Sequence, residues 1–410
     1  MNVLYLSYDG MTDPLGQSQV IPYLVGLTKY GYKFTVISFE KFDNYQKRNT
    51  SISAILKQTS INWVPMTYHK SPPVFSTIYD LLMLRNKAIE LHTKEKFQIV
   101  HCRSYVTSLV GLYLKKNLGI KYIFDMRGYW ADERVDGKIW NLSNPLYKMI
   151  HTYFKKKESE FLSNADYTIS LTHNAKKDIH SWKTVKNQPV PIEVIPCCAD
   201  LHFYSSINVN KAESVKFSQK LKITSRDLVL SYLGTIGSWY LLDEMFDFFN
   251  RLLLKKNNAK FLFITPDDPL HLIEKAKQKG IDTSKLVIYS ANRNEVPLLL
   301  SLSNVSIFFI QPVYSKKASS PTKQGEIMGM GIPLICNDGV GDVGDIMKSG
   351  KSGVLVHEFT NKEYDAIVDN IDTILAIPPL QIQQAAYEFY SLEKGIEKYL
   401  AVYKSLGMRS

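Results

Sequence analysis

Residues 319–333 read SSPTKQGEIMGMGIP and follow the apolar run VSIFFI, an order that predicts a strand, a tight turn and a short helix. Ser320 suits the N-cap of that helix, and Pro321 suits its first position. The backbone N–H groups of Thr322 and Lys323 would then lie at the positive end of the helix dipole, where anions bind. Because Lys323 adds a full positive charge, we expect a phosphate or diphosphate ligand here.

Glu326 lies one helical turn beyond Thr322, where its carboxylate can accept hydrogen bonds from a ribose diol. Gly329 and Gly331 carry no side chains, so neighbouring chain can approach the helix closely. The alternative is a purely structural capped helix in which Lys323 pairs with Glu326 at i,i+3.

A second turn of small residues, Gly234, Thr235, Ile236 and Gly237, also follows an apolar strand. Its backbone N–H groups could hold the same phosphate, although a GxxG pattern is as typical of a simple tight turn. The sequence has no GxGxxG followed by a ribose-binding acid and no GxxxxGK[ST]. These absences disfavour a dinucleotide oxidoreductase and a P-loop kinase.

Polar residues also follow several apolar runs in the first half of the chain. Gly16 lies in the bent loop YDGMTDPLGQSQ, and Arg103 follows FQIVHC. The run KYIFD leads into a long polar loop, residues 125–140, which holds Asp125, Arg127, Trp130 and Asp132. We expect a binding site to include these residues. A loop-stabilising Asp125–Arg127 pair is the alternative.

Short apolar runs alternate with longer segments of helical period, which predicts βαβ units and parallel sheets. Ligands of such sheets bind beyond the carboxyl ends of the strands, where the residues above fall. A Lys-rich polar stretch at 208–224 is typical of an interdomain connection. We therefore predict an α/β fold with two doubly wound Rossmann-like domains facing across a cleft. Their predicted ranges are 1–200 and 201–390, and residues 391–410 are predicted to form a C-terminal helix returning toward the first domain.

The amino-acid composition limits the class of protein and its location in the cell. The 410 residues are 45% hydrophobic and 22% charged, as in soluble globular proteins with more than one core. The longest apolar runs fall short of the ~20 residues that cross a bilayer, and the N-terminus lacks the basic start of a signal peptide. We expect a cytoplasmic protein, with the inner face of the membrane as an alternative place. The four cysteines show no metal-ligand spacing, so we expect reduced thiols and no metal site.

The net charge of +11 is unevenly distributed, because residues 1–200 hold 26 Lys and Arg against 17 Asp and Glu. Part of the excess lies in residues 146–161, where apolar residues at helical spacing adjoin Lys155, Lys156 and Lys157. This pattern fits a core-facing helix with a solvated basic edge, or a basic surface that meets anionic lipid. Nucleic acid is disfavoured as a partner, because no recognition module accompanies the charge.

These motifs resemble the retaining glycosyltransferases of family 4, which have the GT-B fold. The similarity covers nearly the whole chain: DPLGQSQVIPYLVGLTKYGYKFTVIS, FDMRGYWADERVDGKIW, VIPCCADLHF and SPTKQGEIMGMGIPLICNDGVGD. The second segment is similar to a subgroup that builds bacterial surface polysaccharides such as capsule and O-antigen. The resemblance implies that Thr322 and Lys323 meet the donor's diphosphate and that Glu326 meets its ribose. It also implies a glycan or polyprenyl-linked acceptor, which the first domain would bind, while the second domain would bind the donor. On this basis we predict that Gly16 belongs to the donor site and that Asp125 and Arg127 act in catalysis with Lys323. The acceptor-side candidates are Arg103, Trp130 and Asp132.

Two departures from the family pattern affect the donor site. Many members carry a second glutamate eight residues before the position of Glu326, where this chain has Ala318. Many also place an Arg and a Lys after the first strand of the donor domain, where this chain reads GTIGSWYLLDE. Lys323, Arg127 and Arg293 are candidates for the missing positive charge, and no metal cofactor is then required. The alternatives are a sugar-nucleotide epimerase of the same fold and a non-catalytic sugar-nucleotide binding protein.

Overall fold

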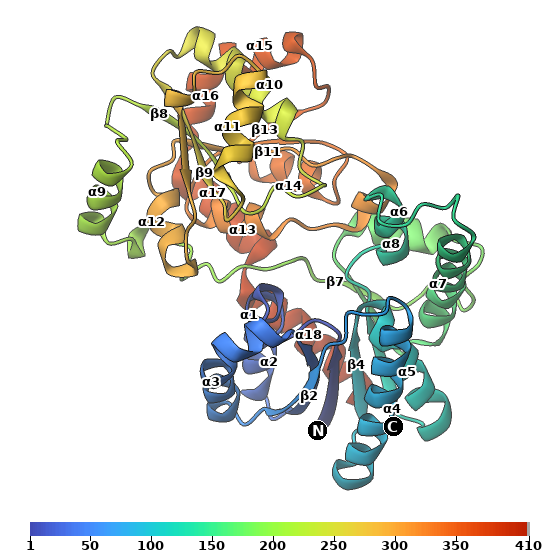
Figure 1. The fold of residues 1–410 in the computed structure, drawn as a ribbon. Coiled ribbons are helices and arrows are strands. Elements are labelled where there is room, and N and C mark those ends of the chain that lie inside the picture. The colour runs from blue at the N-terminus through green and yellow to red at the C-terminus, as the bar shows by residue number, and fades with distance from the viewer. Residues whose placement is uncertain (408–410) are drawn as a thin grey trace. The chain divides into compact units, whose positions relative to one another are not determined.

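The computed structural model describes residues 1–407, which form two units, each built on its own parallel sheet (Figure 1). Unit 1 comprises residues 1–196, the short segment 317–319 and the C-terminal helix α18 (Leu392–Gly407). Unit 2 comprises residues 197–316 and 320–391. The predicted class, two doubly wound α/β domains, is confirmed.

The sheet of unit 1 has seven parallel strands in the order β3-β2-β1-β4-β5-β6-β7. Their bounds are β1 (Asn2–Ser7), β2 (Lys33–Glu40), β3 (Asn62–Thr67), β4 (Ile99–Arg103), β5 (Lys121–Asp125), β6 (Tyr167–Ser170) and β7 (Ile192–Val194). The central strands are buried along nearly their whole length because helices cover both faces. The strand order reverses between β1 and β4, which is where ligands bind in doubly wound sheets.

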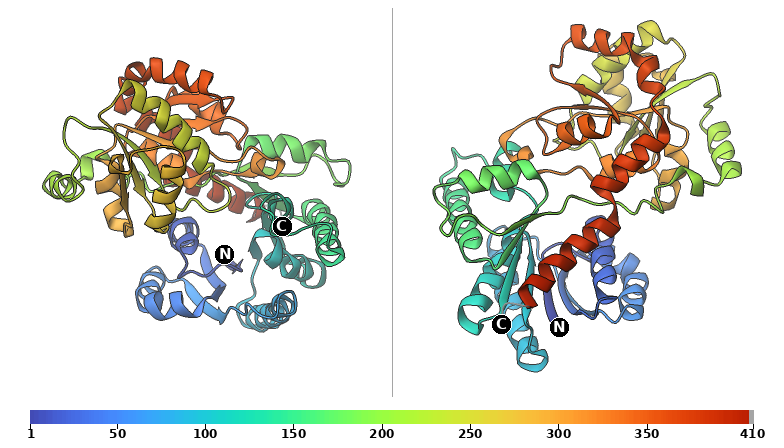
Figure 2. Two further views of the ribbon diagram at one scale, coloured as in Figure 1. Left: turned by 45° about the horizontal axis from the view of Figure 1, so that its top comes forward. Right: turned by 180° about the vertical axis from the view of Figure 1, so that it is seen from behind.

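The helices of unit 1 form two layers. They are α1 (Pro14–Gln19), α2 (Ile21–Thr28), α3 (Phe42–Gln58), α4 (Phe75–Glu95), α5 (Ser104–Leu118), α6 (Trp130–Asp136), α7 (Pro145–Asn164) and α8 (His173–Ser181). Helices α4, α5 and α7 pack side by side on one face of the sheet, while α18 packs against α2 on the other face (Figures 1 and 2). Gly26 permits the second contact, since a Cβ there would lie 2.3 Å from Ile396 Cδ1.

Unit 2 has six parallel strands in the order β10-β9-β8-β11-β12-β13. They are β8 (Leu228–Leu233), β9 (Ala259–Ile264), β10 (Leu286–Tyr289), β11 (Val305–Phe308), β12 (Leu334–Asn337) and β13 (Gly353–Val356). The helices are α9 (Lys211–Lys220), α10 (Leu242–Lys255), α11 (Pro269–Gln278), α12 (Val296–Leu300), α13 (Thr322–Gly329), α14 (Val343–Gly350), α15 (Asn361–Asp369), α16 (Ile371–Leu375) and α17 (Pro379–Tyr390). Helix α13 packs against α17, and residues 309–321, which include a 3-10 helix at Tyr314–Ala318, connect β11 to its start. The prediction of a tight turn between this strand and helix was therefore wrong.

Candidate functional site

Helix α13 begins at Thr322, directly after Pro321, which is extended (φ −70°, ψ 112°) and occupies the N-cap position. The prediction of Ser320 as the N-cap was therefore wrong by one residue. The Ser320 hydroxyl accepts a hydrogen bond from the Cys197 N–H at 3.1 Å instead of capping the helix. Within residues 1–407, the N–H groups of Thr322 and Lys323 have no acceptor. They are therefore available to an anion.

Close packing fixes the position of α13. A Cβ at Gly325 would lie 2.8 Å from the Tyr390 Cβ, and a Cβ at Gly329 would lie 2.7 Å from the Tyr204 carbonyl oxygen. Any side chain at either position would push the helix away from its neighbours. The Tyr390 hydroxyl also donates to Gln324 Oε1 at 2.8 Å. The start of α13 is thus a rigid element, as a binding site requires.

The Lys323 side chain reaches from α13 to the end of β8. Its ammonium donates to the Tyr232 hydroxyl at 3.0 Å and lies 3.6 Å from the ring centre of Tyr240. The nitrogen is 3.4 Å from where a Cβ of Gly234 would stand. Burial lowers the pKa of Lys323 well below its ordinary value, although Glu326 opposes the shift. The structure therefore brings the two motifs picked out in the sequence into direct contact.

Glu326 lies one turn further along α13, beside Tyr204. Tyr204 and the positive charge of Arg293 both favour the ionised form of the Glu326 carboxyl group. Burial raises the pKa of Glu326 above its usual range, and these neighbours only partly offset it. No ion pair within 4.0 Å joins Lys323 and Glu326 in the described chain, so the structural i,i+3 pair does not form. Lys323 contacts Tyr232 and Tyr240, whereas Glu326 lies beside Tyr204.

The 234–237 turn follows β8 and is held from both sides. Gly234 and Gly237 both have positive φ (98° and 52°), a conformation that favours glycine. The Thr235 carbonyl accepts from the Tyr232 hydroxyl at 2.8 Å, and the Ile236 N–H donates to Asp267 Oδ2 at 2.7 Å. Thr235 and Gly237 are exposed at the surface of the turn.

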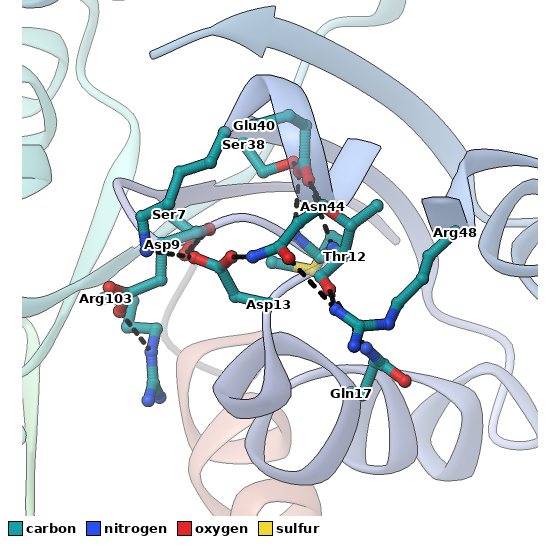
Figure 3. Close-up of polar contacts among 12 residues, drawn as sticks. Ser7, Asp9, Thr12, Asp13, Gln17, Ser38, Glu40, Asn44, Arg48 and Arg103 are labelled. Carbon is teal, nitrogen blue, oxygen red and sulfur yellow. Dashed lines mark hydrogen bonds and ion pairs between the residues drawn. The ribbon is translucent and has the colours of Figure 1, made fainter. Parts of the chain in front are cut away.

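In unit 1, the loop after β1 is organised by a buried acid that the sequence analysis missed (Figure 3). The Glu40 carboxylate, at the end of β2, accepts from the N–H groups of Met11 and Thr12 at 2.7 and 3.1 Å and from the Ser38 hydroxyl at 2.6 Å. Gly16 closes the loop on itself, since a Cβ there would lie 2.2 Å from the Gly10 carbonyl oxygen. The structure thus gives Gly16 a packing role.

Asp125 is fully buried at the end of β5 and is surrounded by polar groups of unit 1. Its Oδ2 accepts from His101 Nε2 at 3.4 Å and from the Tyr399 hydroxyl at 3.3 Å. The other His101 nitrogen is 2.7 Å from the Tyr403 hydroxyl. Burial opposes ionisation, but Arg127 and His101 outweigh it, so the pKa of Asp125 lies below its ordinary value. Helix α18, which carries both tyrosines, is therefore part of this cluster.

Two arginines lie near Asp125. Arg127 has a positive φ of 56°, unusual for a residue other than glycine, and its Nη1 is 3.9 Å from Asp125 Oδ1. Such strain is often found at functional sites, and the charge of Arg127 lowers the pKa of Asp125. Arg103 is buried, and its Nε contacts Asp9 Oδ2 at only 3.4 Å. This contact joins Arg103 to the loop after β1 (Figure 3).

The other acceptor candidates take part in packing within unit 1. The Trp130 ring lies against Tyr105, Trp140 and Phe154, and the Arg134 guanidinium covers it. The Asp132 carboxylate is paired with Lys155 at 2.8 Å and with His151 at 3.2 Å. Both residues shape the loop between β5 and α7.

The position where the family's second glutamate is missing lies in unit 1. Ala318 is buried in the hydrophobic core of that unit. The flanking residues are held there as well, because the Thr172 hydroxyl donates to the Lys317 carbonyl at 2.7 Å and Ser319 contacts Glu133 at 3.4 Å. A carboxylate at this position would have to be buried, which explains why a small residue fits.

Within residues 1–407, no group of three or more His, Cys, Asp and Glu side chains is placed to hold a metal ion. Over the same residues, no helix combines the length and apolar character needed to cross a membrane. The four cysteines are buried and form no disulfide within the described residues.

Two domain families match the chain. Residues 20–203 match the model of Glycosyltransferase Family 4, and residues 214–389 match the model of Glycosyl transferases group 1. Together these matches span most of the sequence. No curated protein sequence matches significantly.

Solved structures share the fold over the full length. A glycosyltransferase from Rickettsia africae has a TM-score of 0.71 at 15% identity, covering 100% of this chain and 99% of that one. Anabaena Alr3699/HepE in complex with UDP and glucose has a TM-score of 0.71 at 12% identity, covering 99% and 100%. A Listeria monocytogenes protein described as a UDP-N-acetylglucosamine 2-epimerase has a TM-score of 0.59 at 13% identity, covering 100% and 97%. With a glycosyltransferase domain in each half and this shared fold, the chain belongs to the glycosyltransferases of the GT-B fold.

Proposed function

We propose that the protein moves a sugar, with retention of configuration, from a nucleoside diphosphate sugar to a glycan or polyprenyl-linked acceptor. The observation that carries this proposal is the contact between the start of α13 and the β8 turn. There, two N–H groups without an acceptor and a lysine without a carboxylate ion-pair partner, judged over residues 1–407, lie beside a glycine turn. A diphosphate has the charge and acceptor oxygens that such a site lacks.

Each donor residue has a role in this scheme. The Thr322 and Lys323 N–H groups and the Lys323 ammonium bind the diphosphate, with Gly234, Thr235 and Gly237 lining the same site. Ser320 holds the preceding chain in place through its bond to the Cys197 N–H. The Glu326 carboxylate accepts hydrogen bonds from the ribose. The UDP and glucose bound to the structurally similar Anabaena protein support a nucleotide-sugar donor.

Unit 1 binds the acceptor in this proposal. Asp125 and Arg127 lie at the end of β5, beside the strand-order reversal of the sheet. Trp130 and Asp132 act indirectly, because their contacts hold the loop that follows those two residues. Arg103 acts on the loop after β1 through its contact with Asp9. Gly16 shapes the adjacent loop after β1, and its assignment to the donor stays a proposal.

The reaction needs no protein nucleophile. The bond between the sugar's anomeric carbon and the diphosphate breaks while the acceptor hydroxyl attacks from the same face, and its proton passes to the departing phosphate. Negative charge builds on the diphosphate as that bond breaks. Lys323 and the N–H groups of the α13 start stabilise this charge more in the transition state than in the ground state.

Contact with the inner face of a membrane would suit a polyprenyl-linked acceptor. On α7, Leu146, Met149 and Tyr153 are exposed at helical spacing, beside the exposed Lys148 and Lys156. Lys155 and Lys157 are less suited to lipid, because they pair with acids of unit 1. On α4, Phe75, Ile78, Tyr79, Leu82 and Met83 form a second exposed apolar face.

Purified protein incubated with a panel of nucleotide sugars, with and without lipid-linked or glycan acceptors, tests the proposal. We expect acceptor-dependent release of nucleoside diphosphate, and NMR of the product should show the donor's anomeric configuration. An isomerised nucleotide sugar without acceptor would identify an epimerase. Binding without turnover under all conditions would identify a non-catalytic binding protein, and an inverted product would exclude retention.

A further inference from the structure

Tyr232 connects the two halves of the donor site through one hydroxyl group. Its hydroxyl hydrogen is donated to the Thr235 carbonyl at 2.8 Å, within the 234–237 turn. Because a phenol has only one hydrogen, its oxygen must accept the hydrogen bond from the Lys323 ammonium at 3.0 Å. Tyr232 is fully buried in β8, so this chain of hydrogen bonds is rigidly held.

The Lys323 ammonium sits between two aromatic rings. It is 4.1 Å from the ring centre of Tyr232 and 3.6 Å from that of Tyr240, distances at which a cation is attracted to the ring faces. The rings exclude water from the amine but bring no negative charge. Lys323 is 8% exposed.

The charged groups around Lys323 have other partners. Asp267, in the loop after β9, accepts from the Ile236 N–H and from the Thr265 hydroxyl. Glu326, on α13 itself, lies near Tyr204 and Arg293, and Cys197 lies near Tyr240. No carboxylate among residues 1–407 comes within 4.0 Å of the Lys323 nitrogen. The ammonium is thus buried without a counterion.

We propose that Tyr232 is a positioning residue that ties Lys323 to the 234–237 turn, and that a bound diphosphate becomes the missing counterion, so that donor binding draws one proton onto Lys323. This inference rests on the proposed function. The proton comes from water or buffer, adds to the amine nitrogen and leaves again when the diphosphate departs. No covalent bond changes.

The expected pH dependence follows from two protonation states. In the empty site, burial lowers the pKa of Lys323, and a bound diphosphate raises it by direct charge attraction. Between these two pKa values, binding takes up a proton, so affinity falls as pH rises through that interval. Below the interval the amine is already charged, and affinity does not depend on this group.

The experiment is titration calorimetry of UDP, ADP, GDP and CDP in buffers of low and high ionisation enthalpy. Measurements above neutral pH avoid the titration of the ligand's own terminal phosphate. For the tightest ligand, we expect close to one proton taken up per site in the wild type and none in Lys323→Gln. Tyr232→Phe keeps the ring but removes the acceptor for Lys323, so its affinity should begin to fall at lower pH.

The control is Tyr364→Phe, which removes a buried hydroxyl that has no hydrogen-bond partner within residues 1–407. This variant should keep the wild-type dependence of nucleotide affinity on pH.

Binding without proton uptake, or equal uptake in Lys323→Gln, would overturn the inference but leave the proposed donor site unaffected. An unchanged pH profile in Tyr232→Phe would overturn the role of Tyr232. If no nucleoside diphosphate binds the wild type, the proposed function itself fails. Should Tyr232→Phe not fold, the wild type and Lys323→Gln still decide the proton uptake.

Discussion

The start of α13 in unit 2 and the Asp125 cluster in unit 1 both follow parallel strands, yet their charges are balanced differently. Asp125 receives hydrogen bonds from His101 and Tyr399 and lies near Arg127, so its charge is balanced within the unit. Lys323 contacts a hydroxyl and two ring faces, and no carboxylate among residues 1–407 lies within 4.0 Å of its nitrogen. A charge balanced by its neighbours organises structure, whereas a buried charge without a counterion suits binding of an ion.

The largest effect should come from breaking the balanced cluster. Asp125→Asn keeps the shape but removes the charge facing Arg127, and loss of one partner of a buried pair costs about 3–5 kcal/mol in the free energy of unfolding. Urea denaturation measures this effect. The exposed Asp43→Asn in α3 is the control and should change stability by less than about 0.5 kcal/mol.

The pH dependence of stability sharpens that test. The native pKa of Asp125 is lowered, so its carboxylate stabilises the fold above the ordinary aspartate pKa. That contribution is lost as pH falls through the lowered native value. The part of the acid transition due to Asp125 should be missing in Asp125→Asn, and identical acid unfolding of both proteins would contradict the account of unit 1.

In unit 2, Glu326→Gln should affect binding more than folding. Removing the charge weakens hydrogen bonds from the ribose, which should cost about 1–3 kcal/mol in nucleotide affinity by calorimetry. Because burial raises the pKa of Glu326, wild-type affinity should also decline on acidification earlier than for an ordinary glutamate. Exposed Glu274→Gln in α11 is the control. Unchanged affinity in a folded Glu326→Gln protein would remove this residue from the site.

Membrane contact should depend on the exposed lysines of α7. Reversing Lys148 and Lys156 to Glu should weaken binding to anionic vesicles by about 2 kcal/mol, because each basic residue near the surface contributes roughly 1 kcal/mol. Co-sedimentation at low and high salt measures this effect. The same reversals at Lys211 and Lys216 of α9 should have no effect. Indifference of the wild type to lipid charge would favour an acceptor free in solution.

Metal removal should have the smallest effect. If Lys323 and the N–H groups of α13 stabilise the leaving diphosphate, transfer should continue at the same rate in excess EDTA. Loss of activity with recovery on adding manganese would show that the charge is supplied by a metal ion and not by Lys323.

The sequence predicted the fold class because alternating apolar runs and helical periods persist along the whole chain. The edge strand β3 was not predicted, since its side chains are mostly half-exposed and it contains Pro65. Strand β13 was not predicted either, because it is only four residues long and begins at Gly353. Short and edge strands bury too little apolar surface to leave a clear pattern.

The polar strand ends were predictable, but their partners were not. Lys323 and Gly234 both follow strands, and in a parallel sheet such positions come together. Tyr232 is indistinguishable in the sequence from the core residues of LVLSYLG, and Tyr399 lies far along the chain from Asp125. Glu40 could have been predicted as a strand-end residue, because it is an acid directly after the apolar run KFTVISF.

The central claim is that Lys323 stabilises the departing diphosphate, and steady-state kinetics of Lys323→Ala test it most directly. We expect kcat to fall by about 100-fold or more, with a smaller change in donor affinity, because the charge develops in the transition state. Thr322→Ala is the matched control: it keeps the backbone N–H groups and should have little effect. A Lys323→Ala protein that melts as the wild type does and transfers sugar at the wild-type rate would contradict the account.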